Sequence, residues 1–359
     1  GISAESVDFV SAHATGTKMG DVIEAQAMGR VYGKSPLVTG LKSYMGHTMG
    51  SCGAIEMMIT SYMMEEGFIA PTLNLENIDE RCNMINHAQE LVESDIRIAA
   101  VILNCPVGRI ADNLERMAGW VGAAKKQKAD VVCFPEMNIT GYSSSANIKK
   151  VAETVPGKIS QSVSDMAQTY DIAILAGLAE SDLAGRVFAS HLVTTNQGVS
   201  GTYRKVHIAP PESQIFTAGD TIPLFDINGF KLGIQLCYDA HFPELSTRMA
   251  TDGADAIFMP HASPRGTPAE KFDSWMRHLS ARAFDNGLFV IACNQTGDNQ
   301  NELNFPGLAV VLNPAGHILK KDTGGKENLI VANLKAGDLE EIRGHRMRYF
   351  LPHRRPDLY

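Results

Sequence analysis

From about residue 95 onward, the chain alternates short apolar runs with amphipathic stretches. Ile96–Leu103 and Ala129–Phe134 are apolar runs of strand length. The stretch between them, 110–127, places its apolar residues at helical spacing, namely Leu114, Met117, Ala118 and Val121. The alternation continues, with strands expected at 172–176, 187–194, 201–207, 232–236, 256–259, 287–293, 308–312 and 329–334 and helices near 160–170, from 243, and through 275–284. Many strands alternating with helices predict a layered α/β domain.

The first 94 residues follow a different pattern. Residues 7–10 predict a short strand, and residues 21–31 predict a helix that stops at Gly33. Residues 53–64 are apolar at most positions and predict a buried helix that ends at Gly67.

Composition changes near residue 95. Residues 1–94 carry five Lys or Arg against twelve Asp or Glu and hold nine of the sixteen methionines. The remaining 265 residues carry 27 basic and 28 acidic residues, which is close to balance. We therefore expect two domains, 1–94 and 95–359, in a chain of 359 residues.

The composition argues against several classes of protein. The net charge of −8 gives no basic surface for nucleic acid, and the absence of eighteen consecutive apolar residues predicts no membrane-spanning helix. The first residues do not resemble a signal peptide. The six cysteines form no C-x-x-C pair, so we expect neither structural zinc nor a disulfide framework, and the chain fits a reducing cytoplasm. No metal or cofactor is expected.

Three chemically useful side chains follow the ends of predicted strands: Glu136, Lys205 and Cys237. Taken singly, they fit a solvated loop carboxylate, a surface lysine and a small buried hydrophobe. Strand ends in one α/β domain converge on a common crevice, so together they predict a nucleophile, a base and an electrostatic stabiliser. The turn after Cys237 and the helix that Pro243 opens are expected to favour a thiolate.

The motifs around these residues resemble those of the nitrilase superfamily of carbon–nitrogen hydrolases. The matching stretches are Phe134–Tyr142, Tyr203–His207 and Cys237–Leu245, and the resemblance covers about residues 95–359. It implies a four-layer α-β-β-α sandwich, commonly paired into dimers, so that we expect a homo-oligomer, a dimer or larger. With the N-terminal segment described below, the predicted fold class is α/β: a nitrilase-like sandwich preceded by a thiolase-like partial domain.

The resemblance also implies roles for individual residues. Glu136 would take the proton of Cys237, whose sulfur attacks the substrate carbon. The ammonium of Lys205 and the backbone N–H of Tyr238 would stabilise the oxyanion. Glu212 would hold Lys205 or the substrate in place.

The substrate is predicted only by class. The sequence Cys-Tyr-Asp at 237–239 favours an amide or N-carbamoyl substrate, and nitrile hydrolysis by the same residues is the alternative. Tyr142, Tyr238 and the loop that contains His261 are expected to line the substrate pocket. The stretch from Arg265 to Lys271 is a candidate for binding a substrate carboxylate.

Residues 1–94 resemble the carboxyl-terminal part of β-ketoacyl synthases, which have the thiolase fold. The motifs are Ala-His-Ala-Thr-Gly-Thr at 12–17 and the Lys42 to His47 stretch. By resemblance, His13, Lys42 and His47 take the places of residues that assist condensation at a cysteine in the missing half. Cys52 lies in a glycine-rich turn rather than at that cysteine's position, and no ketosynthase activity is expected.

Two other interpretations stay open. In one, the chain is a non-catalytic assembly module whose residues 1–94 dock an acyl-carrier or synthase partner. In the other, the junction at residue 95 joins two unrelated sequences by artefact. Because the half-fold leaves apolar faces uncovered, we expect residues 1–94 to remain a docking appendage or a remnant.

Overall fold

The computed structural model describes residues 3–65, 67–89, 92–93 and 95–358. The chain divides into two compact units, Gly1–Ser94 and Asp95–Tyr359. The predicted domain boundary falls between residues 94 and 95, and Ser94 lies outside the described residues. Residues 1 and 2, which belong to the stretch compared with a signal peptide, also lie outside them. No described helix has both the length and the apolar character needed to cross a membrane.

The larger unit contains two six-stranded sheets. The first has the order β10-β9-β8-β7-β6-β19, and the second β11-β12-β13-β14-β17-β18. Strands of the first sheet are β6 (Ile96–Ile102), β7 (Val131–Cys133), β8 (Ala173–Ser181), β9 (Val187–Thr195), β10 (Gly198–Arg204) and β19 (Asn328–Leu334). Strands of the second are β11 (Phe225–Ile227), β12 (Phe230–Ile234), β13 (Ala256–His261), β14 (Phe289–Asn294), β17 (Ala309–Leu312) and β18 (Ile318–Asp322). A short ribbon pairs β15 (Thr296–Asp298) with β16 (Asn304–Pro306).

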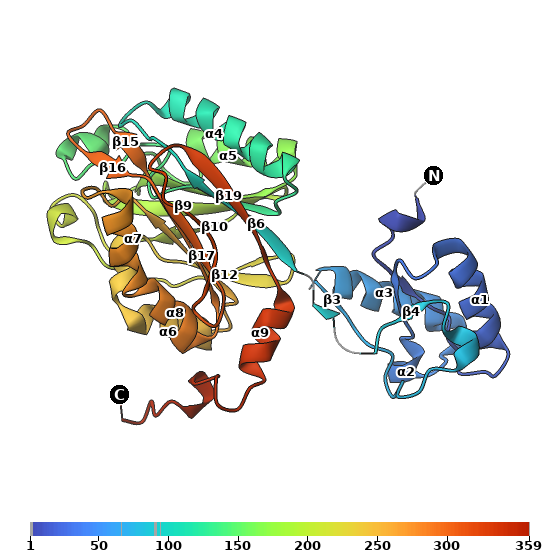
Figure 1. Ribbon diagram of the computed structural model, residues 1–359. Helices are drawn as coiled ribbons and strands as arrows, with labels where there is room; N and C mark the ends of the chain where they lie inside the picture. Colours follow the sequence, from blue (N-terminus) through green and yellow to red (C-terminus); the bar gives the residue numbers. More distant parts are fainter. Residues whose placement is uncertain (1–2, 66, 90–91, 94, 359) are drawn as a thin grey trace. The chain divides into compact units, whose positions relative to one another are not determined.

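Helices cover the outer faces of the two sheets (Figure 1). On the first sheet lie α4 (Ile110–Lys126) and α5 (Lys158–Tyr170). The second sheet carries α6 (Pro243–Thr251), α7 (Pro268–Met276) and α8 (Leu279–Asn286), and α9 (Ala336–Arg343) follows β19. Short 3-10 turns are η4 (Ala146–Lys150), η5 (Pro210–Glu212), η6 (Cys237–His241) and η7 (Leu351–His353). The predicted four-layer sandwich is confirmed.

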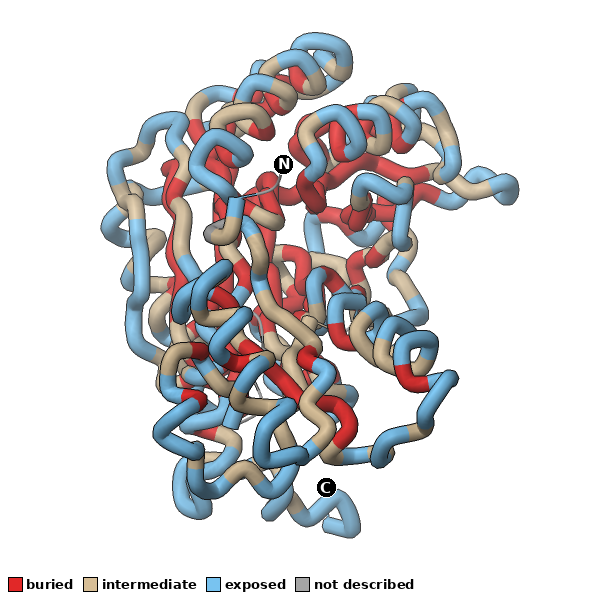
Figure 2. The backbone as a smooth tube through the Cα atoms, turned by 90° about the vertical axis from the view of Figure 1, so that its right-hand side faces the viewer, coloured by how far each residue is buried: buried red, intermediate tan, exposed pale blue. Residues whose placement is uncertain are grey.

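The two faces of strand β6 belong to two different hydrophobic cores. Ile96, Ile98 and Ile102 belong to the core between the sheets, whereas Val101 and Leu103 belong to the core beneath α4 and α5. Successive side chains of a strand point to opposite faces, so an almost continuously apolar strand fills two cores at once. Figure 2 shows the result as long buried stretches along the strands, while the helices alternate between buried and exposed positions.

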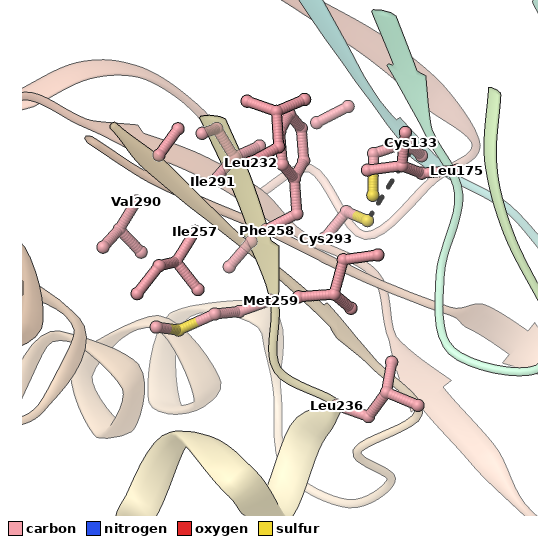
Figure 3. Packing of buried hydrophobic residues seen from close by; sticks show 14 of the residues in the cluster. Cys133, Leu175, Leu232, Leu236, Ile257, Phe258, Met259, Val290, Ile291 and Cys293 are labelled. Carbon is pink, nitrogen blue, oxygen red and sulfur yellow. Dashed lines mark hydrogen bonds between the residues drawn. The ribbon is translucent and has the colours of Figure 1, made fainter. Parts of the chain in front are cut away.

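The two sheets meet through side chains without charge. In Figure 3, Cys133 of β7 and Cys293 of β14 face each other, and the Cys293 thiol lies 3.9 Å from the backbone oxygen of Cys133. Both side chains are buried. All six cysteines of the chain are free thiols, and Cys237 is the one that is not fully buried.

Two predictions for the larger unit need correction. The strand expected at 201–207 is β10, which ends at Arg204, so Lys205 is the first residue of the loop. The helix expected through 275–284 is two helices, α7 and α8, separated by His278, whose φ of −125° is not helical. The sequence has neither Pro nor Gly at this break, so its pattern could not reveal it.

The smaller unit has a three-stranded parallel sheet of β1 (Phe9–Ser11), β2 (Leu37–Thr39) and β4 (Asn86–His87). Its helices are α1 (Gly20–Tyr32), α2 (Lys42–Met45) and α3 (Cys52–Glu65), with turns η1 (Ala4–Ser6), η2 (Met49–Ser51) and η3 (Glu80–Cys82). Strand β3 (Phe68–Ile69) pairs with β5 (Val92–Glu93).

The prediction of a buried second helix is wrong. Of the residues in α3, only Cys52 and Met63 are buried, and the side chains of Met57 and Met58 are 71% and 73% exposed. A helix that is apolar on most sides needs neighbours on most sides. The small core of this unit, built around Ala25, Val38 and Ile85, covers only part of it.

Candidate active site

The predicted site residues follow strands of both sheets. Glu136 comes three residues after β7, Lys205 directly after β10, and Cys237 three residues after β12. The Lys205 Nζ atom lies 2.8 Å from Oε1 of Glu136 and 2.9 Å from Oε2 of Glu212. The ammonium therefore sits between two carboxylates, and all three side chains are buried.

Glu136 is held on every side. Its Oε1 accepts from Lys205, its Oε2 accepts from the backbone N–H of Ala262 at 3.0 Å, and its backbone oxygen accepts from Nε2 of Gln295 at 2.8 Å. Burial raises the pKa of Glu136 to about 6. The charge of Lys205 opposes this shift, and the charge of Glu212 adds to it. A carboxyl group with this pKa exchanges its proton readily near neutral pH.

Lys205 carries the positive charge of the cluster. Although burial disfavours the charged form, the carboxylates of Glu136 and Glu212 raise the pKa of Lys205 above its usual value. Glu212 is positioned in turn by the Tyr142 hydroxyl, which donates to its Oε1 at 2.8 Å, and by the backbone N–H of Ala209 at 3.1 Å. The ammonium is therefore fixed, charged and shielded from water.

Cys237 lies at a strained turn. Its φ of +43° falls in the left-handed region that side chains other than glycine avoid. Such strain persists only where the surrounding structure imposes it, and it is common at functional sites. The turn η6 starts at this residue, and α6 begins only at Pro243.

The structure adds an effect that opposes the expected stabilisation of a Cys237 thiolate by the turn and the helix. Burial and the negative charge of Glu136 raise the pKa of the Cys237 thiol, while Lys205 and the backbone N–H of Ala262 act in the opposite direction. These surroundings favour the protonated form of the thiol.

Asp239 is a positioning residue that sequence reasoning missed. Its buried carboxylate accepts from the Tyr203 hydroxyl at 2.8 Å, from the backbone N–H of His207 at 2.8 Å and from the backbone N–H of Leu236 at 3.0 Å. Nδ1 of His207 also lies 2.9 Å from this carboxylate. One side chain thus joins the Lys205 loop to the Cys237 turn. The one available signal was a charged residue two positions after Cys237.

The predicted pocket residues lie at the edges of this cluster. Tyr142 is nearly buried and binds Glu212, and burial, together with the charge of Glu212, raises the pKa of its hydroxyl. His261 is buried, with Nδ1 2.6 Å from the backbone oxygen of Met259 and its ring 4.2 Å from that of Trp275. Burial lowers the pKa of His261, so the ring is neutral. Tyr238 is half-buried, with its ring edge-on to His241 and Phe242.

Helix α7 carries a cation, Lys271, that interacts electrostatically with Cys237 and holds the loop after β13. Lys271 donates to Oγ of Ser263 at 2.8 Å and to the backbone oxygen of Pro264 at 2.9 Å. Asn294 holds the same loop, accepting from the backbone N–H of Ser263 at 2.9 Å. Burial lowers the pKa of Lys271, and its electrostatic interaction with Cys237 opposes this shift.

In the smaller unit, each of the three residues singled out by resemblance, His13, Lys42 and His47, makes a defined contact. The rings of His13 and His47 meet edge to face, with centroids 5.4 Å apart. Lys42 is buried in an ion pair with Glu56 of α3. Across the described parts of both units, no group of three or more His, Cys, Asp or Glu side chains is arranged to hold a metal ion.

Comparisons with known proteins agree with this geometry. Residues 97–344 match the family model for carbon–nitrogen hydrolases, and residues 1–76 match that for the C-terminal domain of β-ketoacyl synthases. A probable nitrilase of Schizosaccharomyces pombe is 29% identical over 73% of this chain and 96% of its own. An (R)-stereoselective amidase of a Pseudomonas species is 30% identical over 67% and 85%. Saccharomyces cerevisiae Nit3, a solved member of the nitrilase superfamily, has a TM-score of 0.64, 26% identity and coverage of 70% and 94%.

Proposed function

This chain belongs to the carbon–nitrogen hydrolase family and is a carbon–nitrogen hydrolase, and we propose that it cleaves a small-molecule amide or N-carbamoyl substrate through a thioester on Cys237. The observation that carries the proposal is the buried Lys205 ammonium, 2.8 Å from Glu136 and 2.9 Å from Glu212, which interacts electrostatically with the Cys237 thiol on its strained turn. An acid–base group, a cation and a nucleophile in one buried cluster are what acyl transfer requires.

The first half of the reaction uses the raised pKa values. Glu136 accepts the proton of the Cys237 thiol as the sulfur attacks the carbonyl carbon. The charge that develops on the carbonyl oxygen is stabilised by the Lys205 ammonium and the backbone N–H of Tyr238. A donor of this kind is typically worth about 3–4 kcal/mol in the transition state. Glu136 then protonates the leaving ammonia or amine, which departs as the carbon–nitrogen bond breaks.

In the second half, Glu136 removes a proton from water, and the resulting hydroxide attacks the thioester. The carbon–sulfur bond breaks, the acid leaves, and Cys237 regains its proton. Glu136 therefore acts as base, acid and base in turn, for which a pKa of about 6 is well suited. Glu212 and Tyr142 are proposed to act as positioning residues, since Glu212 fixes Lys205 and Tyr142 fixes Glu212.

We further propose that the substrate carries a carboxylate that Lys271 binds. Lys271 donates only to a hydroxyl and a backbone oxygen, and it takes part in no ion pair within the described ranges of the chain. A half-buried ammonium near the nucleophile is well placed to bind such an anion. His261 packs against Trp275 of α7, the helix that carries Lys271. Its proposed part in substrate binding is therefore to shape the wall of the substrate pocket.

Two assemblies remain proposals. A homo-oligomer is supported by exposed apolar side chains of the larger unit, namely Phe284, Met347, Phe350 and Leu358. An acyl-carrier or synthase partner is supported by the exposed methionines of α3, Met57, Met58 and Met64. Light scattering tests the first, and titration with a purified acyl carrier protein tests the second. The assembly-module function is an alternative to catalysis and predicts such binding without hydrolysis. A cytoplasmic location stays a prediction.

The decisive experiment for the hydrolase is a substrate panel. Ammonia release from neutral amides, ω-amides of dicarboxylic acids, N-carbamoyl amino acids and nitriles is measured for the natural chain and for Cys237→Ala. Activity toward an amide or carbamoyl compound that Cys237→Ala abolishes supports the proposal. Activity that survives this substitution removes Cys237 as the nucleophile, and activity confined to nitriles replaces the proposed substrate class.

A further inference from the structure

Helix α3 of the smaller unit starts at a cysteine that faces an imidazole. The Sγ atom of Cys52 lies 3.1 Å from Nδ1 of His47, and the Thr48 hydroxyl donates to this sulfur at 3.3 Å. In the sequence, Cys52 does not lie at the position of the cysteine that β-ketoacyl synthases carry in the missing half. Its spacing from other residues does not indicate a hydrogen-bond partner for the thiol. The fold nevertheless makes it one member of a thiol–imidazole pair.

The tautomer of His47 determines which atom of this pair can accept a proton. The backbone N–H of Met49 donates to Nδ1 of His47 at 3.2 Å. A ring nitrogen that accepts a hydrogen bond carries no proton, and the single lone pair of Nδ1 is shared between the Met49 N–H and the Cys52 thiol. A base within hydrogen-bond reach of a thiol, with the base itself oriented, is the arrangement of an activated nucleophile. His13, edge to face with His47, limits the rotation of that ring.

The sulfur lies just below the surface. Cys52 is 4% exposed, while His47 and Met49, which flank it, are both exposed. A small acyl compound therefore has to displace only flexible side chains to reach it. Thr48, as a hydroxyl donor to sulfur, stabilises negative charge that forms there as the proton moves to His47.

The surroundings favour one class of substrate. The ammonium of Lys42 is held by Glu56 rather than directed to an oxyanion, in contrast to the arrangement around Lys205. An amide needs strong oxyanion stabilisation and a protonated amine leaving group, whereas a thiolate leaves a thioester with little assistance.

We propose that Cys52 and His47 form a second nucleophilic site, which accepts an acyl group from a thioester. His47 Nδ1 takes the thiol proton, the sulfur of Cys52 attacks the thioester carbonyl, and the carbon–sulfur bond of the donor breaks. The departing thiolate takes the proton from His47. The products are acyl-Cys52 and a free thiol, with no net oxidation or reduction. This site is independent of the hydrolase chemistry at Cys237.

The test uses the full chain with Cys237→Ala, so that the other candidate nucleophile is removed. The probe is the acetyl thioester of N-acetylcysteamine, and mass spectrometry of peptides measures acetylation at each cysteine over time. Cys82 is the matched control, because it lies in the same unit, is 8% exposed and has its thiol pKa raised by burial. We expect Cys52 to be acetylated at least about 100-fold faster than Cys82, the range of general-base assistance.

A second variant separates catalysis from packing. In the Cys237→Ala background, His47→Ala should slow acetylation of Cys52 about 100-fold, and imidazole added to the buffer should restore part of the rate. A merely structural His47 would not give such rescue. Equal acetylation of Cys52 and Cys82, an unchanged rate in His47→Ala, or a loss that imidazole leaves untouched would each overturn the proposal.

Discussion

Oδ2 of Asp239 lies 2.8 Å from the hydroxyl oxygen of Tyr203, although 36 residues separate them in the chain. Tyr203 is the penultimate residue of β10, two before Lys205, and Asp239 is two residues after Cys237. The hydrogen bond therefore joins the two sheets close to Lys205, the candidate oxyanion stabiliser, and to Cys237, the candidate nucleophile. The same carboxylate binds the backbone N–H of His207, which fixes the loop on the far side of Lys205.

We expect Asp239→Asn to lower kcat/KM strongly while leaving the fold in place. The Asn amide keeps one acceptor oxygen but replaces the other with a donor, which faces an N–H or O–H group. Each lost hydrogen bond to the buried charge costs about 1.5–3 kcal/mol. Because the loss displaces the turn that begins at Cys237 but leaves Glu136 in place, kcat should fall with little change in the acid limb of the pH profile. Asp226→Asn, at an exposed position of β11, is the matched control. Unchanged kinetics in Asp239→Asn would contradict the positioning role.

The pH dependence of catalysis should follow Glu136. The carboxylate form is needed to accept the thiol proton, so kcat/KM should fall as pH drops through about 6, the pKa of Glu136. The charge of Glu212 contributes to raising the pKa of Glu136, so Glu212→Gln should move this acid limb to lower pH. The rate profile between pH 4 and 9 measures both. A limb that stays in place or moves upward in Glu212→Gln would show that another group controls it.

Lys271→Met should separate substrates by their charge. If Lys271 binds a substrate carboxylate, its removal raises KM for ω-amides of dicarboxylic acids and leaves the constants for a neutral amide of equal length nearly unchanged. A lost charge-assisted hydrogen bond is worth about 1.5–3 kcal/mol, or roughly 10- to 150-fold in kcat/KM. Lys126→Met, at an exposed position at the end of α4, is the matched control. Equal losses for charged and neutral amides would indicate a structural role for Lys271 in holding Ser263.

The sequence was informative where chemistry depends on residue type at a strand end. Glu136, Lys205 and Cys237 could be selected because each was expected at the end of a strand, and the predicted neighbour of Lys205, Glu212, does contact it. The roles of these residues stay predictions. Asp239 was missed because its four hydrogen bonds reach groups 3 to 36 residues away. The Ala262 N–H was missed because a backbone donor leaves no trace in residue type.

The smaller unit was the harder part to predict. Its apolar helix α3 is typical of a buried element, and the sequence cannot show how much of the fold is present to cover it. The pairing of Cys52 with His47 depends on the turn η2, where Met49 adopts a φ of +57°. That conformation is unusual for methionine and is not predicted by its residue type.

Acid stability of the larger unit should depend on His191. This residue of β9 lies opposite Gly177 and Tyr203 in the sheet, and its ring is completely buried. Burial lowers the pKa of His191 to about 3. In the unfolded chain the pKa is about 6.5, so between pH 6.5 and 3 the unfolded state binds a proton that the folded state does not.

Stability should therefore be lost as pH falls below about 6.5, by about 1.4 kcal/mol for each pH unit, or roughly 2 kcal/mol at pH 5. Urea unfolding followed by tryptophan fluorescence measures this for the larger unit alone, because both tryptophans, Trp120 and Trp275, belong to it. His191→Leu removes the titrating group, so its free energy of unfolding should change less between pH 7 and 5 than that of the natural chain. His345→Leu, at an exposed histidine, should keep the full difference. If the natural chain and His191→Leu lose the same free energy on acidification, then His191 is not the group whose protonation destabilises the fold.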